Sequence, residues 1–556
     1  MNSTKNIKKV FLILNISFIL FFAPKILAAN VGESLNFNVE SSFDSSARSQ
    51  VTGELIKTSP NIYFYVEKNW WDTQLTSKQN EILLNLDVLS SEFNNKIYPI
   101  LTSTFGSEWT PGVDNDPKIN IFFESMKEGA GGYFRSNDEY VKLQIPNSNE
   151  KEMIYINLSH IDDSMLKVFV AHEFTHLIEF NQKERINKVQ EETWLNEARA
   201  DYSSTILGYD DSYEGSNLQS RVKDFLQNPT DSLTEWQENK YDYASISLFM
   251  HYLVDHYSTN VLYSSLKSKL VGIASIDEAL LKQGSQENFS QIFTNWTIAT
   301  LINDCSLDLK YCYLNQNLKK LKINPTLNFL PLSGNSSLSV TNLTKNWSGN
   351  WQKIIGGSGG SLKLDFSSLT GLNFQVPYLV FDKDSNYSIK FLKLDSKENG
   401  QLQVDNFGTQ YSALVILPSL QTKSSGFDGI EFTYPYTFTA SVSGSIPEGD
   451  QEIIQKLLLQ IDSLKKQIAT LQNGSNQSNL CSSLNNNLYL GVSNNNVTCL
   501  QQFLKDQGQD IYPEGLVTGY FGSLTKSAVM RFQKKYNIPN TGFVGSLTRN
   551  KINQML

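Results

Sequence analysis

The 556-residue sequence predicts a multidomain protein, and three features support this prediction. Residues 30–324 combine apolar strand patterns with long apolar helical stretches, which is typical of an α+β domain. From about Pro325 the pattern changes to short alternating runs separated by Gly, Ser and Asn, which favours an antiparallel β-sandwich. Two smaller segments follow, a short heptad helix and a small three-helix C-terminal module. A chain of this length is expected to hold roughly three to four domains.

Residues 1–29 have the pattern of an export signal peptide. Three lysines lie within the first nine residues, Val10–Phe22 is apolar, and Leu27–Ala29 supplies a small-residue end. The apolar run is shorter than the roughly 20 residues that span a bilayer. We therefore expect cleavage, with a retained anchor as the alternative because Pro24 and Lys25 lie in the cleavage region. No later segment is expected to span a membrane.

The composition fits an exported protein that does not bind nucleic acid. The net charge is −9 and the chain has no basic cluster. Its four cysteines form two local pairs, Cys305 with Cys312 and Cys481 with Cys499, which predict two disulfides. A structural zinc site is disfavoured, because neither pair has C-x-x-C spacing or a nearby His.

The run His172–His176 has the pattern HExxH in a chain with only five histidines. On a helix, positions i and i+4 share one face, so both imidazoles can reach one tetrahedral ion. Glu173 then lies at the open side of that ion, which predicts a general base for hydrolysis of an amide bond. The alternative is a buried helix with two hydrogen-bonded core histidines.

A third metal ligand is expected further along the chain. The extended pattern HExxHxxGxxH fails, because Glu179 stands in place of Gly and Gln182 in place of His. The later run Glu192–Tyr202 resembles the second signature of the gluzincins, since it contains parts of the thermolysin-type N-E-x-x-x-D and the aminopeptidase-type W-L-N-E-G. It departs from the second type at Ala198, where that type has Gly.

This resemblance implies site roles for individual residues. Glu197 is implied as the third zinc ligand, and Asp201 as the residue that orients His172 through its other ring nitrogen. Relatives stabilise the oxyanion with a Tyr or His; Tyr243 is the favoured candidate, and the alternatives are Tyr241, His251 and His256. A solvated helix carboxylate is the other interpretation of Glu197.

Residues from about Asn38 to Leu321 resemble the hyicolysin-type and immune-inhibitor-A-like secreted bacterial peptidases. Besides the two helical motifs, the matching pieces are Asp114–Pro117 and Gly131–Phe134. The resemblance implies a zincin-type metallopeptidase domain over residues 30–324 that binds Zn²⁺, with a strand-rich N-terminal lobe and a helical C-terminal lobe. Helices are expected at Ala244–Tyr257 and Phe289–Leu301 in the second lobe.

Zincins commonly bind a peptide along the edge strand of their sheet. Lys118–Phe123 and Met153–Asn157 are predicted strands. Gly131–Phe134 is predicted either as the edge strand, with glycines that allow close backbone approach, or as an ordinary turn. Asp114 and Asp116 could hold Ca²⁺, but a solvated turn that ends at Pro117 is the favoured interpretation.

Residues 325–446 are the predicted β-sandwich, a spacer or a substrate-binding module without visible chemistry. Residues 450–472 carry a heptad seam, whose apolar positions are Ile454, Leu457, Ile461, Leu464, Ile468 and Leu471. Three heptads form only marginal coiled coils, so a rigid stalk is favoured over pairing with another chain or packing on the same chain. A flexible linker at residues 473–480 closes the segment.

Residues 481–556 contain an internal repeat. Gly519–Lys526 recurs as Gly542–Arg549, and each copy places Ser and Thr at the start of a predicted helix. The predicted helices are Val497–Lys505, Leu524–Tyr536 and Leu547–Met555. The segment resembles the peptidoglycan-binding domain, although Asn494–Asn496 replaces that family's usual Gly-Asp turn. Seven basic and three acidic residues suit an anionic cell wall, or simply form a solvated face.

Together these features predict a secreted bacterial zinc metallopeptidase that cleaves proteins and is held at the cell wall. Two alternatives remain open at this stage. The wall itself could be the substrate, which would make the protein a peptidoglycan cross-link hydrolase. The protein could also be a wall-bound adhesin with an inactive peptidase fold, although all the expected site residues are present.

Overall fold

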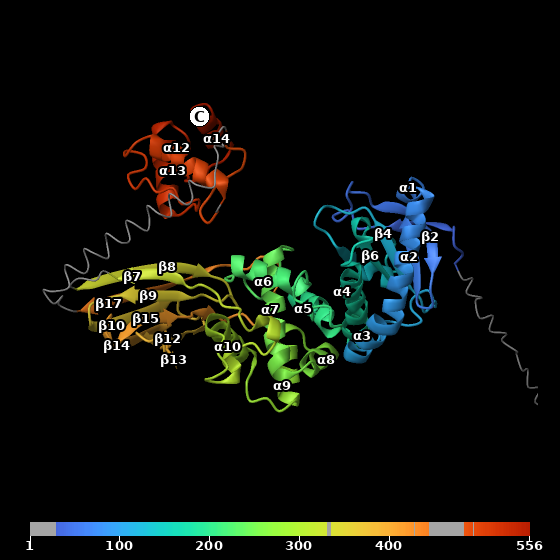
Figure 1. Ribbon diagram of the computed structural model, residues 1–556, viewed down its shortest axis with the longest axis horizontal. Helices are drawn as coiled ribbons and strands as arrows, with labels where there is room; N and C mark the ends of the chain where they lie inside the picture. Colours follow the sequence, from blue (N-terminus) through green and yellow to red (C-terminus); the bar gives the residue numbers. More distant parts are fainter. Residues whose placement is uncertain (1–28, 331–334, 428, 444–482, 493) are drawn as a thin grey trace, which may run out of the picture. The chain divides into compact units, whose positions relative to one another are not determined.

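A computed structural model describes residues 29–330, 335–427, 429–443, 483–492 and 494–556. It shows a multidomain α+β protein that divides into two compact units, Met1–Ile446 and Pro447–Leu556 (Figure 1). The predicted signal peptide (apart from Ala29), heptad helix and linker lie outside the described residues, as does Cys481. Within the described ranges, no helix is long and apolar enough to cross a membrane.

The first unit begins with a six-stranded sheet. Its strands are β1 (Ser34–Asn38), β2 (Gln50–Thr58), β3 (Ile62–Glu67), β4 (Ile119–Glu124), β5 (Gly132–Phe134) and β6 (Met153–Asn157). They lie in the order β1-β2-β3-β4-β6-β5; β3, β4 and β6 are parallel, and the remaining neighbours pair antiparallel. The prediction that Gly131–Phe134 supplies an edge strand is confirmed, because β5 is the outermost strand beside β6.

Both faces of this sheet are buried, which explains its nearly continuous apolar runs. On β3, Phe64 and Val66 face the main core with the helices, whereas Tyr63 and Tyr65 face a smaller core. This alternation follows from the two-residue period of a strand. The strands predicted at Lys118–Phe123 and Met153–Asn157 are present as β4 and β6.

Helices cover the sheet and continue into a helical region (Figure 1). They are α1 (Lys68–Trp71), α2 (Thr76–Glu92), α3 (Tyr98–Phe105), α4 (Leu166–Glu179), α5 (Thr193–Ile206), α6 (Asn217–Gln227), α7 (Lys240–Tyr257), α8 (Asn260–Lys267), α9 (Gly272–Lys282) and α10 (Phe289–Ile302). A π-helical turn, Phe180–Ile186, continues α4. The helices predicted at Ala244–Tyr257 and Phe289–Leu301 are confirmed as parts of α7 and α10.

The strands after α10 form a sandwich-like sheet around their own core. They are β7 (Thr326–Leu330), β8 (Ser336–Thr344), β9 (Gln352–Gly356), β10 (Gly360–Ser368), β11 (Phe374–Gln375), β12 (Pro377–Asp382), β13 (Tyr387–Phe391), β14 (Asn399–Phe407), β15 (Tyr411–Ile416), β16 (Ser419–Leu420) and β17 (Tyr434–Ser443). The main sheet has the order β13-β12-β15-β14-β10-β17-β8, with β9 between β15 and β7. The expected antiparallel pairing is broken where β7 pairs parallel to β9 and β14 meets β15.

Besides its own core, this sheet region contributes residues to the core of the helical region. Trp347 and Trp351 belong to the same buried cluster as the residues of α10. The Trp351 indole donates a hydrogen bond to the Thr297 carbonyl at 2.9 Å, and the rings of Trp347 and Phe289 lie 5.0 Å apart. Both parts accordingly belong to one compact unit.

A loop of the same sheet region supports the start of α5. The backbone N–H of Gly426 donates to Glu192 at 2.8 Å, and the Trp194 indole donates to the other oxygen of that carboxylate at 2.7 Å. Glu192 directly precedes α5. The sandwich-like sheet therefore contributes to placing the helix on which Glu197 lies.

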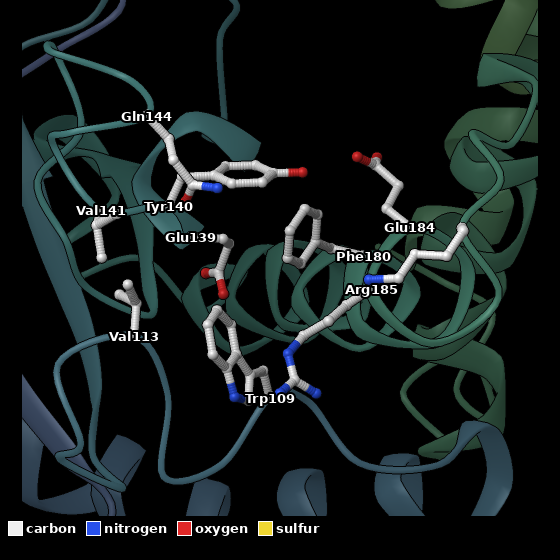
Figure 2. Close-up of a pocket in the computed structure, with 10 residues that line it drawn as sticks. Trp109, Val113, Glu139, Tyr140, Val141, Gln144, Phe180, Glu184 and Arg185 are labelled. Atoms are coloured by element: carbon white, nitrogen blue, oxygen red, sulfur yellow. The ribbon is translucent and has the colours of Figure 1, made fainter.

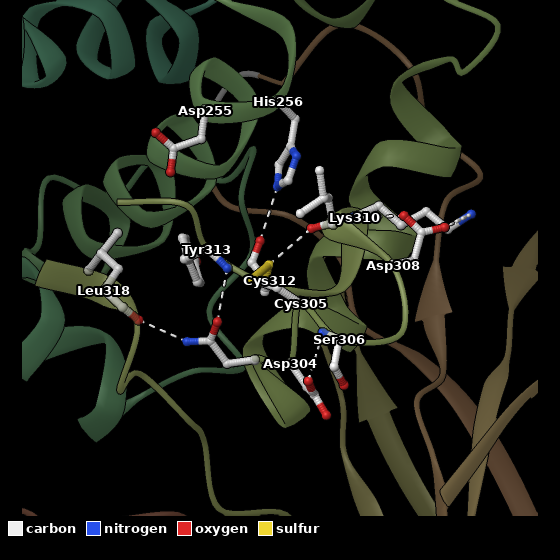
Figure 3. The surroundings of a disulfide bond; sticks show 12 residues. Asp255, His256, Asp304, Cys305, Ser306, Asp308, Lys310, Cys312, Tyr313 and Leu318 are labelled. Atoms are coloured by element: carbon white, nitrogen blue, oxygen red, sulfur yellow. Dashed lines mark hydrogen bonds and ion pairs between the residues drawn. A yellow bond between two sulfur atoms is a disulfide. The ribbon is translucent and has the colours of Figure 1, made fainter. Parts of the chain in front are cut away.

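The disulfide between Cys305 and Cys312 is confirmed (Figure 3). It closes the loop after α10, with a Cα–Cα distance of 5.1 Å. The His256 imidazole donates to the Cys312 carbonyl at 3.0 Å and so ties this loop to α7. Of the second predicted pair, Cys499 is disulfide-bonded, whereas Cys481 lies outside the described residues.

The second unit contains α12 (Asn495–Asp506), α13 (Ser523–Lys535) and α14 (Ser546–Asn553), which confirms the three predicted helices. Its internal repeat has a structural basis in two buried glutamines. Gln501 accepts from the N–H of Gly519 at 2.8 Å, and Gln533 accepts from the N–H of Gly542 at the same distance. Each glutamine thereby fixes the Gly turn that begins the following helix.

Candidate metal centre

Three side chains converge between α4 and α5. His172 Nε2 lies 3.2 Å from Glu197 Oε2, and His176 Nε2 lies 3.6 Å from Glu197 Oε1. Two ligands at about 2.0 Å from one tetrahedral ion would be separated by about 3.3 Å, so these distances suit a shared metal. Within the described residues, this is the one group of three or more His, Cys, Asp or Glu side chains whose ligand atoms all lie within 4.8 Å of one another.

Glu173 lies beside this group and against the edge strand. It is buried, and burial raises the pKa of its carboxyl group. A Cβ atom on Gly132 of β5 would lie 3.0 Å from Glu173 Oε1 and 2.6 Å from the Tyr155 carbonyl oxygen. Only glycine therefore allows the edge strand to pass this close to the carboxylate.

Glu179, which in the sequence is only a departure from HExxHxxGxxH, is the partner of His176. Its Oε2 lies 2.9 Å from His176 Nδ1, the ring nitrogen that faces away from Glu197. Burial lowers the pKa of His176, but the charges of Glu197 and Glu179 outweigh this effect and raise it to about 10. A carboxylate on the outer nitrogen orients a ligating imidazole and increases its basicity. The i, i+3 spacing of the two residues on α4 is the signal that could have indicated this pair.

Glu179 is the first member of a buried charged network (Glu179, Arg199, Glu191 and Lys183). Arg199 lies 3.8 Å from Glu179 and 3.0 Å from Glu191, and Lys183 lies 3.1 Å from Glu191. All four side chains are almost completely buried. Their charges alternate in sign, so the network holds the Glu179 carboxylate without leaving a net buried charge.

Asp201 has different partners from those expected. Its Oδ1 accepts from Arg221 at 2.7 Å and from Asn217 at 3.0 Å, and the described contacts include no hydrogen bond from the His172 ring. Burial raises the pKa of Asp201, but the Arg221 guanidinium outweighs it and lowers the pKa overall. The charge of the His172 ring also contributes to lowering the pKa of Asp201, so the assignment of Asp201 as the orienting partner of His172 stays a prediction.

Tyr243 lies next to the three converging side chains. Its ring centroid is 6.4 Å from that of His172, with the Arg221 guanidinium 4.7 Å over the ring and Trp236 at 4.9 Å. Burial, together with the charge of Glu197, raises its pKa well above the usual value. The hydroxyl group therefore remains a hydrogen-bond donor at neutral pH.

The other oxyanion candidates lie elsewhere. Tyr241 contacts the Lys240 ammonium group, and the described contacts do not connect it to the ligands. His256 binds the disulfide loop. His251 is buried between Thr205 and Asn315, each at 3.3 Å from one of its ring nitrogens. The structure thus brings only Tyr243 to the centre.

His251 is expected to make the protein acid-labile. Burial lowers its pKa to about 4, so its contribution to stability is complete above the unfolded value of about 6.5 and is lost as the pH falls through 4. The loss amounts to about 3 kcal/mol, at about 1.4 kcal/mol per pKa unit. His251→Gln should reduce the difference between the urea unfolding free energies at pH 7 and pH 4 by this amount. His256→Gln is the control, and equal pH dependence in all three proteins would contradict the prediction.

The suggested calcium residues already have protein partners. Asp116 accepts from the Tyr63 hydroxyl at 2.9 Å, and Asp114 pairs with Lys151 at 3.2 Å. Asp114 also accepts from the N–H of Asp116, as in an ordinary Asx turn. The turn interpretation therefore accounts for both carboxylates.

Comparisons with known proteins bear mainly on the second unit. Residues 493–552 match the family model of the peptidoglycan binding domain. The chain carries a peptidoglycan-binding domain. In that domain Asn494, which departs from the usual turn, begins α12 by accepting a hydrogen bond from the N–H of Val497. This domain fits association of the protein with a cell wall.

For the remaining chain the comparisons are weak. No curated protein matches. The M60 catalytic domain of Clostridium perfringens ZmpB, with its CBM51 domains, is 9% identical over 69% of this chain and 59% of that chain, with a TM-score of 0.24. The lysozyme inhibitor PliG of Aeromonas hydrophila is 11% identical over 22% of this chain and all of its own, with a TM-score of 0.15. TM-scores this low do not establish a shared fold.

Proposed function

We propose that the first unit is a zincin-type zinc metallopeptidase, of the gluzincin group, that hydrolyses peptide bonds in proteins. The observation that supports this most is the convergence of His172, His176 and Glu197, with Glu173 beside them at the edge of the sheet. Between 12% and 17% of each ligand side chain is exposed, so the centre is open to a substrate.

The donor set fits zinc, because two imidazoles and one carboxylate are common ligands of catalytic zinc sites that keep a fourth position open. A zinc ion held there supplies Lewis acidity that activates a water molecule and polarises the scissile carbonyl. Glu179 orients His176 for this role through the outer ring nitrogen.

Side chains and backbone groups of the protein supply the remaining chemistry. Glu173 accepts the proton of the attacking water and passes it to the leaving amine, and its raised pKa suits both transfers. The Tyr243 hydroxyl donates a hydrogen bond to the developing oxyanion. The outer edge of β5 offers backbone groups that hold the substrate in an extended conformation.

Export and wall retention complete the proposal. The peptidoglycan-binding domain is proposed to hold the secreted enzyme at the cell wall, so that catalysis and retention are separate tasks of separate parts of the chain. The same match favours a second candidate, in which peptidoglycan cross-links are the substrate. An inactive, wall-bound adhesin is a weaker alternative, because the ligands and the base are all present.

The test is zinc content together with casein cleavage by the mature protein. Bound zinc with casein cleavage would support the proposal. Zinc with release of fragments from purified peptidoglycan, but no casein cleavage, would favour the second candidate. A protein that binds no zinc after loading would refute both enzyme proposals and leave a wall-binding protein.

Tyr243→Phe is expected to lower kcat about 10²- to 10³-fold, because the variant loses one donor to the oxyanion. The KM should change little, since the ring and its contact with Arg221 remain. Steady-state kinetics on a quenched peptide would measure both constants. Tyr241→Phe is a matched control two residues away and should behave as the wild type; equal losses in both variants would argue against the role of Tyr243.

A further inference from the structure

The first unit contains a cavity with a volume of about 260 Å³ (Figure 2). Its lining includes Trp109, Glu139, Tyr140, Phe180 and Glu184. This volume is sufficient for one long side chain rather than a complete small-molecule ligand.

A row of aromatic rings connects the cavity to the metal centre. The Phe134 ring, on the edge strand β5, lies 6.4 Å from the His176 ring and 6.1 Å from Phe180. Phe180 in turn lies 5.7 Å from Tyr140. Phe180 and Glu184 also line a smaller cavity of about 140 Å³ that includes His176. A peptide held along β5 would therefore pass near both the cavity and the candidate metal centre.

The unusual feature of the cavity is the Glu139 carboxylate. Figure 2 shows it directed towards Trp109 and Val113. The residue is 1% exposed, and its Oε1 has no hydrogen-bond partner among the described residues. An unpaired buried carboxyl group is costly, and a partner that enters the cavity from outside would offset this cost. Burial and the charge of nearby Glu152 raise the pKa of Glu139, and a bound cation would relieve both effects.

The geometry favours an organic cation over a metal ion. Neither Glu139 nor Glu152 belongs to a described group of three ligands close enough to share one ion. Aromatic rings around the cavity suit the stem and charge of a long cationic side chain. The lining also includes two basic residues, Arg185 and Lys188, and both are exposed. The Arg185 guanidinium already stacks over the Trp109 ring at 4.1 Å.

We propose that this cavity is a specificity subsite that accepts a lysine or arginine side chain of the substrate, with Glu139 as its charged partner. The proposal depends on the proposed peptidase function only for the statement that the bound peptide is cleaved. Glu139 follows the edge strand by five residues, so backbone pairing on β5 and side-chain recognition by Glu139 can act on one extended peptide.

Binding to the zinc-loaded Glu173→Gln protein tests the subsite independently of catalysis. The probes are sets of peptides. Within a set, one position carries lysine, arginine, norleucine or glutamate, and the rest of the peptide is unchanged. Each set varies a different position. At one position, lysine and arginine should bind at least about tenfold more tightly than norleucine, as expected for a hydrogen bond to a charged group. Adding Glu139→Gln should remove this preference while norleucine peptides still bind. Equal binding of lysine and norleucine at every position would overturn the proposal.

Three further measurements make the result specific. Glu81→Gln removes an exposed carboxylate on α2, outside the cavity, and should leave the preference intact; an equal loss of the preference there would overturn the role of Glu139. Glu139→Asp shortens the side chain by one methylene and should shift the preference from lysine to the longer arginine. This variant replaces Glu139→Gln in the test if the latter does not fold. Tight calcium binding that depends on Glu139 would also overturn the proposal. Lysine-dependent binding without cleavage by the wild type would refute only the peptidase function.

Discussion

Glu173→Gln is expected to abolish peptide hydrolysis while the protein keeps its zinc. The carboxylate is not one of the three converging ligands, so the metal-binding atoms are unchanged. Glutamine occupies nearly the same volume beside Gly132, where space is limited, but it cannot accept the proton of the attacking water. Loss of a general base typically costs 10²- to 10⁴-fold in rate. Single-turnover cleavage of a quenched peptide and metal analysis of the same preparation measure both quantities.

The control is a carboxylate outside the proton path. Glu184→Gln makes the same chemical change on the turn after α4 and should retain hydrolysis of a peptide without basic residues. If Glu173→Gln kept a rate within tenfold of the wild type, the proposed mechanism would be wrong. If it lost zinc, the effect on rate would not report on proton transfer, and the position of Glu173 beside the metal would need revision.

The main features of the candidate metal centre could be predicted because they are local. HExxH places two imidazoles on one helical face, and the Glu192–Tyr202 run places Glu197 on the next helix. Strand β6 and helix α7 were also predictable, because their apolar patterns are long and regular. These parts of the fold depend on residues that are close together in the sequence.

The features that the sequence did not predict depend on tertiary contacts. Asp201 matches the motif, yet its carboxylate binds Arg221 from α6, and that partner has no marker in the sequence. Trp347 and Trp351 lie in an apparently independent module, and only the structure shows that they pack on α10. The Glu139 carboxylate lies in a cavity formed by segments distant in sequence, so no local pattern distinguishes it from a solvated residue.

Glu197→Gln is expected to lose zinc and hydrolysis together. Its carboxylate contacts both imidazoles, so the variant retains two strong ligands instead of three and loses the negative charge that offsets the ion. Equilibrium dialysis against a competing chelator measures the affinity. Zinc retained at wild-type affinity would exclude Glu197 as a ligand.

The same measurement distinguishes Glu179 from Asp201 as the residue that supports the imidazoles. The hydrogen bond from His176 to Glu179 predicts that Glu179→Gln lowers zinc affinity about 10- to 100-fold, as removal of such a partner usually does. Asp201→Asn should lower it less, because that carboxylate pairs with Arg221 and Asn217 instead of a ligand. Glu179→Gln also removes one of the two carboxylates that contact Arg199 and leaves only Glu191, so this variant could lose stability without metal. Thermal unfolding with chelator present would measure the stability of the metal-free form of both variants. A larger loss of affinity in Asp201→Asn would instead support the role that its motif implies.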